Sequence, residues 1–329
     1  MSMFARRSFL IGAALAPLAP APAHAQASST QVWPARPVML IIPFPAGGAM
    51  DLLGRGVAQD LADKLGQQFV VDNRAGAAGN IGAMAAAKAS PDGYTILMAG
   101  AASLALNKFM FSNMPYDPET ELTPIVILSR LPHIFVVNAK VEAKTLKELV
   151  DYAKTNPGKL SAGVPGVGTT AHITLEAFMA ETGAKMTVVP YRSEPQMLTD
   201  LVGGQLDVAC TLATSPGPHV QAGRLRALAV TSATRTRQLP DVPTVEQAGF
   251  PGFEATAWFA LAVPTGTPAE IIAKINAAAN AFIRSAKGEE ELNKLDSLPA
   301  GGTPEETKAF IAAEIRKWAP IIKAAKIQM

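Results

Sequence analysis

The sequence is poor in cysteine and histidine and lacks runs of like charge. Its 329 residues include a single cysteine, Cys210, which excludes an intramolecular disulfide and any zinc site built on two or more cysteines. The 29 Lys and Arg against 27 Asp and Glu form no polybasic run, so nucleic acid is not expected as a partner. His133 and His219 have no acid or cysteine at ligand spacing, so we predict neither a metal nor a cofactor.

Several catalytic motifs are also missing. The sequence contains no G-x-S-x-G, S-x-x-K or H-E-x-x-H pattern. The segment 74–82, R-A-G-A-A-G-N-I-G, lacks both dinucleotide G-x-G-x-x-G spacing and the Walker lysine, so we interpret it as a tight turn before a helix. His172 with Thr169 or Asp207 remains a possible hydrolytic set, although a lone histidine at a helix start more often has a structural role.

Residues 1–25 have the pattern of an export signal. Arg6 and Arg7 precede the apolar stretch 9–18, and Ala23-His24-Ala25 has the form of a cleavage site. We therefore expect cleavage near Ala25 and a periplasmic location. The two arginines resemble a twin-arginine signal, but ordinary export signals carry such pairs as well. The apolar stretch is too short to span a bilayer.

The remaining chain alternates apolar runs with helical patterns. This alternation predicts a parallel α/β sheet, and the length suggests two domains. The predicted strands cover residues 37–44, 68–72, 94–98, 124–128, 134–138, 160–164, 186–191, 206–212 and 225–231. The predicted helices cover residues 52–65, 80–89, 146–156, 170–182, 268–286 and 304–325. Capping boxes are predicted at Thr145, Thr244, Thr267 and Thr303.

Two Gly-rich loops, 46–51 and 163–172, each join an apolar strand to a helix. Such loops expose backbone N–H groups at a helix N-terminus, where the helix dipole favours an anion. Two of them in one chain suggest a pincer for a carboxylate. Asp51 is predicted as the N-cap of the first helix, with an indirect role in fixing the loop, since a bare carboxylate repels an anionic ligand.

Three other residues stand out, and only Arg192 among them has a functional interpretation. Arg192, after Tyr191 at a strand end, is suited to pair with a ligand carboxylate or to form an ordinary ion pair. Cys210 lies in an apolar strand and is predicted to be a buried small hydrophobic residue. Trp258 and its apolar neighbours are predicted to pack in the core or between domains.

Several short motifs in a fixed order carry a resemblance to a known family. They are Trp33-Pro34-Ala35-Arg36-Pro37, the segment 43–48 with Asp51, the segments 71–74 and 76–82, 91–95, 115–117, 156–159, 166–169 with His172, 189–191, 225–231 and 239–244. In this order, behind an export signal, the chain resembles the periplasmic solute receptors of tripartite tricarboxylate transporters, the Bug family. The resemblance covers essentially all of the chain after the signal.

The resemblance implies a two-domain α/β periplasmic-binding-protein fold, of the Venus-flytrap, type II-like kind, with a mainly parallel sheet in each domain. It places domain 1 at residues 26–128 plus 246–329 and domain 2 at residues 129–245, with the ligand cleft between them. It also implies a receptor rather than an enzyme. Such receptors hold one ligand carboxylate with two Gly-rich loops and bridging waters.

Carried over residue by residue, the resemblance gives a candidate ligand-binding set. The set is Phe44, Gly47, Gly48, Ala49, Asp51, Ala101, Val164, Gly166, Gly168, Thr169, His172, Tyr191 and Arg192. Ala49 and Val164 stand where the family usually or often has a hydroxyl residue. Each lost hydrogen bond is worth about 0.5–1.5 kcal/mol, or about 1.5–3 kcal/mol to a charged group. We therefore expect a carboxylate less polar than citrate, such as an aromatic or long-chain acid.

The expected partners are a small carboxylate and the integral membrane subunits of the transporter, with the receptor a monomer. Presentation of the ligand to a membrane sensor kinase is an alternative that would use the same fold and pocket. An extracytoplasmic hydrolase using His172 is the alternative from another functional class.

Overall fold

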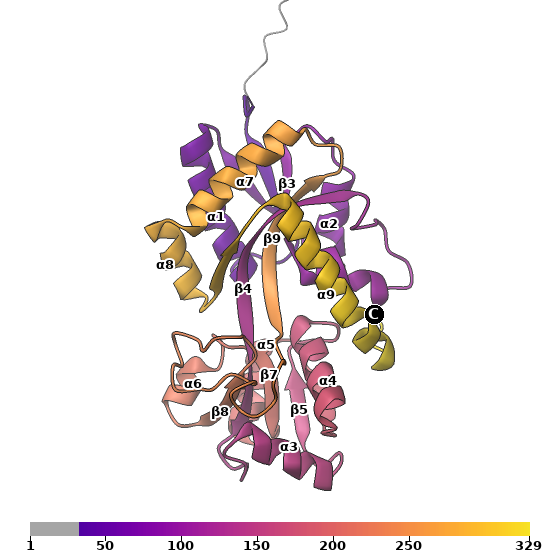
Figure 1. Ribbon diagram of the computed structural model, residues 1–329, viewed down its shortest axis with the longest axis vertical. Coiled ribbons are helices and arrows are strands. Elements are labelled where there is room, and N and C mark those ends of the chain that lie inside the picture. The colour runs from indigo at the N-terminus through magenta and orange to yellow at the C-terminus, as the bar shows by residue number, and fades with distance from the viewer. Residues whose placement is uncertain (1–32) are drawn as a thin grey trace, which may run out of the picture. The chain divides into compact units, whose positions relative to one another are not determined.

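The computed structural model describes residues 33–329, so the predicted export signal at residues 1–25 lies outside the described residues. Strands and helices alternate along most of the chain (Figure 1). The strands are β1 (Val38–Ile42), β2 (Phe69–Asn73), β3 (Thr95–Gly100), β4 (Leu122–Asn138), β5 (Ser161–Val164), β6 (Thr187–Pro190), β7 (Val208–Leu212), β8 (Leu225–Val230), β9 (Thr256–Pro264) and β10 (Leu298–Gly301). The helices are α1 (Ala49–Leu65), α2 (Asn80–Ala87), α3 (Leu146–Thr155), α4 (Thr170–Thr182), α5 (Glu194–Gly203), α6 (Gly217–Gln221), α7 (Ala269–Ile283), α8 (Ala286–Lys294) and α9 (Pro304–Ala324). Short turns η1 (Ala77–Gly79), η2 (Ala102–Leu106) and η3 (Asn107–Phe109) complete the set.

The strands that follow one another through helices pair in parallel, as predicted. β1 lies between β2 and β3, and β5 lies between β6 and β7, with all four pairings parallel. The sheet is nevertheless more mixed than predicted. β9 runs antiparallel to β3 and β4, and β4 runs antiparallel to β7, β8 and β10. The antiparallel strands β9 and β4 therefore lie between the two parallel sets and connect them in one sheet (Figure 1).

β4 corrects the prediction of two separate strands at 124–128 and 134–138. It is one strand of 17 residues, from Leu122 to Asn138. Its first part pairs with β9 as far as Pro132, and His133 is the first residue that pairs with β7. The polar and proline residues between the two apolar runs do not break the strand, because neighbouring strands pair with them. Ser129 is fully buried between β9 and β10.

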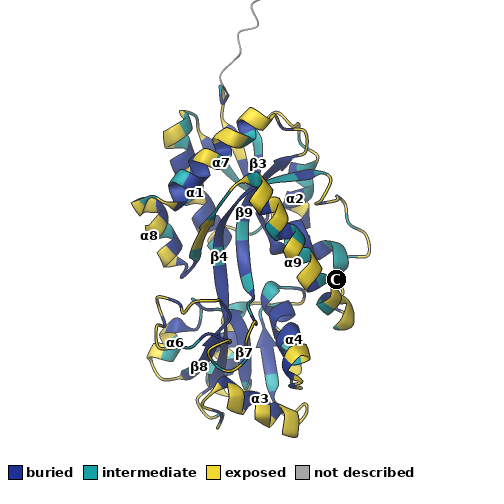
Figure 2. Cartoon of the chain, in the orientation of Figure 1, coloured by how far each residue is buried: buried dark blue, intermediate teal, exposed yellow. Residues whose placement is uncertain are grey.

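The buried residues form a core under the helices (Figure 2). One cluster packs α1, α7 and α8 against β1, β3 and β9. The largest cluster contains side chains from both parallel sets, including Leu97 of β3 and Ala162 of β5. Cys210 is fully buried in this cluster, as predicted, and burial raises the pKa of its thiol well above the ordinary range.

Helix α9 is attached to the long strands through one carboxylate. Glu314 Oε2 accepts hydrogen bonds from the indole nitrogens of Trp258 on β9 and Trp318 on α9, each at 3.0 Å. Phe310 stacks edge-on against Trp258, with ring centroids 5.5 Å apart. The predicted packing role of Trp258 is therefore confirmed for the core.

Helix starts follow the sequence in part. Thr145 caps α3, and Thr303 with Glu306 forms a full capping box at α9. At the predicted capping box of Thr244, Gln247 N donates to the Thr244 hydroxyl and Thr244 N donates to Gln247 Oε1. These bonds close a turn, and no helix follows before β9. The prediction of a capping box at Thr267 is wrong. The N-cap of α7 is Pro268, and the Thr267 hydroxyl donates to Pro264 O.

The predicted helix at 268–286 is α7, which ends at Ile283, and the helix that follows it, α8, was not predicted. The Ser285 side chain caps α8, which begins at the next residue. Among residues 33–329, none of the helices combines the length and the apolar character that a membrane crossing requires.

Candidate functional site

The first Gly-rich loop ends at the start of α1. Gly47 has a φ of +85°, in the left-handed region that favours glycine. Gly48 is the N-cap, and no side chain caps the helix there. The first intrahelical bond runs from Leu52 N to Gly48 O, which leaves the N–H groups of Ala49 and Met50 without a helical acceptor.

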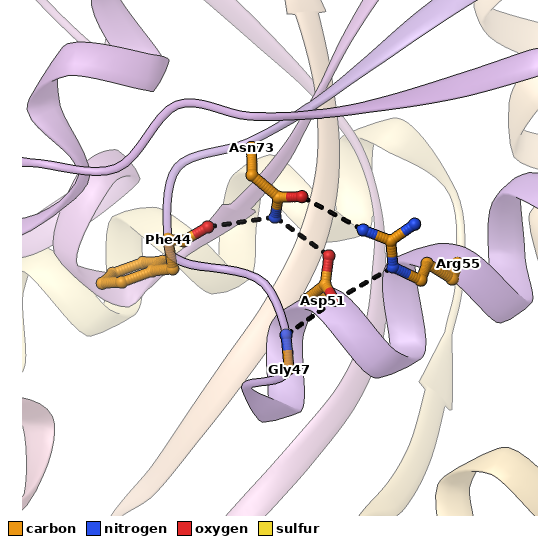
Figure 3. Close-up of polar contacts among 5 residues, drawn as sticks. All are labelled: Phe44, Gly47, Asp51, Arg55 and Asn73. Atoms are coloured by element: carbon orange, nitrogen blue, oxygen red, sulfur yellow. Dashed lines mark hydrogen bonds and ion pairs between the residues drawn. The ribbon is translucent and has the colours of Figure 1, made fainter.

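Asp51 fixes this loop, although it is not the predicted N-cap. It is the third residue of α1, and its carboxylate accepts from Gly47 N at 2.9 Å (Figure 3). Arg55 Nε donates to the same oxygen at 3.0 Å, and Asn73 Nδ2 donates to the other oxygen at 2.9 Å. Asn73 also donates to Phe44 O and accepts from Arg55. The predicted indirect role is thus borne out by the Gly47 contact, whereas the cap is formed by Gly48.

The Asp51 carboxylate is 2% exposed. Burial opposes its ionisation, but the hydrogen bonds from Arg55, Gly47 and Asn73 outweigh burial and hold the pKa of Asp51 below its ordinary value. The carboxylate is therefore charged and fully engaged within the protein. A negative carboxylate repels an anion, so this side chain is not suited to contact one. The groups suited to an anion here are the backbone N–H groups at the start of α1.

The second Gly-rich loop is built in a similar way. Gly166 and Gly168 have φ values of +140° and +70°. Thr169 caps α4: its hydroxyl accepts from His172 N and donates to Gly166 O. Because the first intrahelical bond runs from Ile173 N to Thr169 O, the N–H groups of the first two helical residues are not used within the helix.

His172 holds this loop as Asp51 holds the first. Its Nδ1 accepts from Gly168 N at 3.1 Å, and its Nε2 lies 3.6 Å from Glu176 Oε1. The imidazole is 8% exposed. In both loops, the N–H of a left-handed glycine donates to a side chain four residues later. This pair of glycine clamps shapes the backbone at two helix starts.

His133 lies beneath the start of α4. Its Nε2 is 3.0 Å from the Thr170 hydroxyl and its Nδ1 is 3.4 Å from the Thr174 hydroxyl. Burial lowers the pKa of His133 from 6.5 to about 4, so this imidazole is neutral at neutral pH. It links β4 to the helix that carries the second loop.

A third segment near the first loop was interpreted from the sequence only as a tight turn. The turn is present, and Ala77 and Ala78 adopt left-handed φ values of 47° and 52°, alongside positive φ values at Gly76 and Gly79. Asn107 Nδ2 donates to Ala78 O and to Asn80 Oδ1, and Tyr116 OH donates to Ser103 O at 2.7 Å. Asn73, which joins this region to Asp51, was not predicted either. Only its place after a strand hinted at a role.

The other predicted site residues are placed as follows. Phe44, Ala49, Tyr191, Gly166 and Thr169 are half-buried, whereas Gly47, Gly48 and Arg192 are exposed. Ala101 is 5% exposed at the end of β3. Val164 is fully buried, so its side chain belongs to the core and its link to the site is through the backbone: Val164 O accepts from Tyr191 N.

The groups of the hydrolytic alternative are engaged with other partners. The Asp207 carboxylate accepts from the backbone and hydroxyl of Ser161, at 2.8 Å each. His172 faces Gly168 and Glu176, and the Thr169 hydroxyl donates to a backbone carbonyl. The contacts that the structure describes for these residues do not assemble a nucleophile, a base and an acid.

Comparison with known proteins decides the family. The profile described as "Tripartite tricarboxylate transporter family receptor" matches residues 53–327. The chain belongs to this family. The resemblance inferred from the sequence is thereby confirmed, and the chain is a solute-binding receptor with the two-domain α/β fold of the periplasmic binding proteins in this family.

Relatives of this receptor cover nearly the whole chain. Protein BugT of Bordetella pertussis (strain Tohama I) is 37% identical over 298 residues, which are 90% of this chain and 91% of BugT. A protein of R. palustris solved with adipate matches at a TM-score of 0.79 and 37% identity, over 90% of this chain and 99% of the other. MatC from Rhodopseudomonas palustris, solved with bound malate, matches at a TM-score of 0.74 and 28% identity, over 88% and 100%.

Proposed function

We propose that this receptor is exported to the periplasm, where it binds a small carboxylate between its two Gly-rich loops and releases it unchanged. The observation that carries the proposal is the pair of glycine clamps, Gly47 with Asp51 and Gly168 with His172. Each clamp shapes a loop whose following helix presents unused N–H groups. Helix dipoles and unpaired N–H groups favour an anion, and two of them suit one carboxylate. Neither binding nor release requires a cofactor or bond cleavage.

The proposed binding set is the one predicted from the sequence, with two kinds of role. The loop residues around Gly48 and Thr169 would contact the ligand through their backbone. Asp51 and Val164 would act indirectly, because both side chains are buried and engaged within the protein. The proposed domain boundaries, residues 26–128 plus 246–329 against 129–245, place one loop in each domain. Ligand binding would then favour the closed arrangement.

The ligand is proposed to be less polar than citrate. Ala49, half-buried after the Gly-Gly pair, offers no hydroxyl to a ligand. Two apolar side chains in or next to the loops are exposed: Leu52 by 49% and Val167 by 40%. Such groups suit a methylene chain or an aromatic ring better than further carboxylates. That a relative at 37% identity was solved with adipate, a linear dicarboxylate, supports this ligand class.

Native mass spectrometry of the mature receptor tests the proposal. The protein is mixed in turn with acetate, succinate, adipate, benzoate and citrate. We expect a one-to-one adduct of unchanged ligand mass, with adipate or benzoate retained at least about tenfold more tightly than citrate. Tighter binding of citrate would contradict the ligand class, and a new product mass would favour the hydrolytic alternative.

The proposed partners are the integral membrane subunits of a tripartite tricarboxylate transporter. Presentation to a membrane sensor kinase would use the same pocket, so ligand binding does not separate the two. A pull-down from membranes with ligand-loaded receptor separates them. Recovery of transporter subunits supports the proposal, and recovery of a kinase alone supports the alternative.

A further inference from the structure

The second loop depends on which ring nitrogen of His172 carries the proton. Gly168 N donates to His172 Nδ1 at 3.1 Å, so Nδ1 must be the unprotonated nitrogen. A neutral imidazole then carries its proton on Nε2. That nitrogen lies 3.6 Å from Glu176 Oε1, one turn further along α4. The carboxylate therefore faces the nitrogen that must hold the proton.

We propose that Glu176 is a positioning residue that keeps His172 in the Nε2–H tautomer and so keeps the second loop in its binding shape. A carboxylate facing Nε2 at 3.6 Å favours a proton there electrostatically, and the free Nδ1 then accepts the Gly168 amide. Glu176 would touch no ligand itself. The consequence for affinity rests on the proposed function, whereas the consequence for the tautomer does not.

Gly168 lies in closely packed surroundings. The space where a Gly168 side chain would begin is occupied by the sulfurs of Met110 and Met329, 2.9 and 2.8 Å from an ideal Cβ position. Met110 is 2% exposed, so its side chain is held against the loop, and Met329 N donates to Met110 O. Loss of the His172 acceptor would leave the Gly168 amide without a described partner in a buried position, which is costly.

The tautomer of His172 provides the readout that a purely structural role would not move. A ring with its proton on Nδ1 would point a donor at the Gly168 donor. Glu176 is the carboxylate within ion-pair distance of the ring, and it faces Nε2. His133 meets a different part of α4, at Thr170 and Thr174. Glu176 thus acts on the nitrogen opposite the one that accepts the Gly168 amide.

Three variants distinguish the effect of the acceptor oxygen of Glu176 from the effect of its negative charge. Glu176→Gln keeps an oxygen acceptor but removes the charge. Glu176→Leu removes both and keeps a side chain of similar length. Glu181→Gln, at an exposed position near the end of the same helix, is the matched control. Histidine ring ¹⁵N chemical shifts in the ligand-free receptor report the tautomer, with the His172 signals assigned by their loss in His172→Gln.

We expect wild type, Glu176→Gln and Glu181→Gln to show the Nε2–H tautomer. Glu176→Leu should show mixed tautomers, about 3- to 10-fold faster exchange of the Gly168 amide and a similar loss of adipate or benzoate affinity, the equivalent of one hydrogen bond. A pure Nε2–H tautomer and unchanged amide exchange in Glu176→Leu would overturn the proposal. Because the tautomer and the amide exchange are measured without ligand, failure of carboxylate binding would contradict the proposed function and not this role of Glu176.

Discussion

The backbone N–H of Gly47 donates to Asp51 Oδ2 at 2.9 Å, and this bond closes the first loop over the start of α1. The same carboxylate accepts from Arg55 and Asn73, so a loop, a helix and the end of β2 meet at one buried charge (Figure 3). Since Gly47 is left-handed, its amide direction is set by this contact rather than by regular secondary structure. Asp51 therefore determines where the first set of unused N–H groups points.

Removal of the Asp51 carboxylate should destabilise the receptor. Asp51→Ala leaves the Gly47 amide without its acceptor and removes a hydrogen-bonded charge that is 2% exposed. We expect a loss of about 2–3 kcal/mol in the free energy of unfolding, together with weaker ligand binding. Urea denaturation measures the first effect. Asp63→Ala on the same helix is the control: its side chain is 59% exposed, and we expect a change within about 0.5 kcal/mol. Equal effects of the two substitutions would contradict the role of Asp51.

The two clamped glycines should differ in their tolerance of a side chain. Gly47→Ala meets no atom within 4 Å, so only the strain of a positive φ applies, about 1 kcal/mol. Gly168→Ala adds to this strain a contact with the sulfur of Met110, which is buried and cannot move freely. Thermal unfolding should therefore show the larger loss for Gly168→Ala. A larger loss for Gly47→Ala would show that the packing around the second loop is looser than described.

His133 should make stability depend on pH. Its pKa is about 4 in the folded protein against 6.5 for the ordinary group, so the unfolded chain binds more protons between these values. The free energy of unfolding should fall as pH falls through this window, with His133 contributing about 2–3 kcal/mol between pH 7.5 and pH 4.5. His133→Gln keeps groups able to bond Thr170 and removes the titration. Denaturation across this pH range should give a smaller pH dependence for the variant, and an unchanged dependence would refute the assignment.

Glu314 should stabilise α9 on the long strands. Glu314→Ala leaves the buried indole N–H groups of Trp258 and Trp318 without their common acceptor, at an expected cost of about 2–3 kcal/mol. Glu314→Gln retains an oxygen acceptor and should cost clearly less. Lys308→Ala, at an exposed position of the same helix, is the control. Guanidinium denaturation followed by tryptophan fluorescence measures all three, and similar values for Glu314→Ala and Lys308→Ala would contradict the shared acceptor.

Much of the fold could be predicted because its signals are local. Continuous apolar runs marked β1 and β5, and the Gly-Val-Gly-Thr loop marked the start of α4, which begins at the predicted residue. β9 was missed as a strand, because its Trp258 segment indicates burial equally well in any element. β4 was divided at its polar centre because nothing local shows that β9 and β10 pair with Ser129.

The candidate site shows the same limit. The two Gly-rich loops follow from glycine content and spacing, but the groups that shape them involve distant residues. Asn73 reaches Asp51 across 22 positions, and Met329 packs on Gly168 from the other end of the chain. Capping statistics predicted Asp51 as an N-cap, whereas its burial beside Arg55 and Asn73 made it an acceptor for the loop instead. Such tertiary contacts have no signature in a single sequence.

The most direct test of the account is a titration of the ¹⁵N-labelled mature receptor with adipate, followed through backbone amide signals. Binding between the two loops predicts that the amides of Ala49 and Met50 and those of Thr170 and Ala171 shift together, with one common dissociation constant. Saturable shifts confined to one of the two helix starts, or absent from both, would contradict the proposal that the two loops hold one carboxylate.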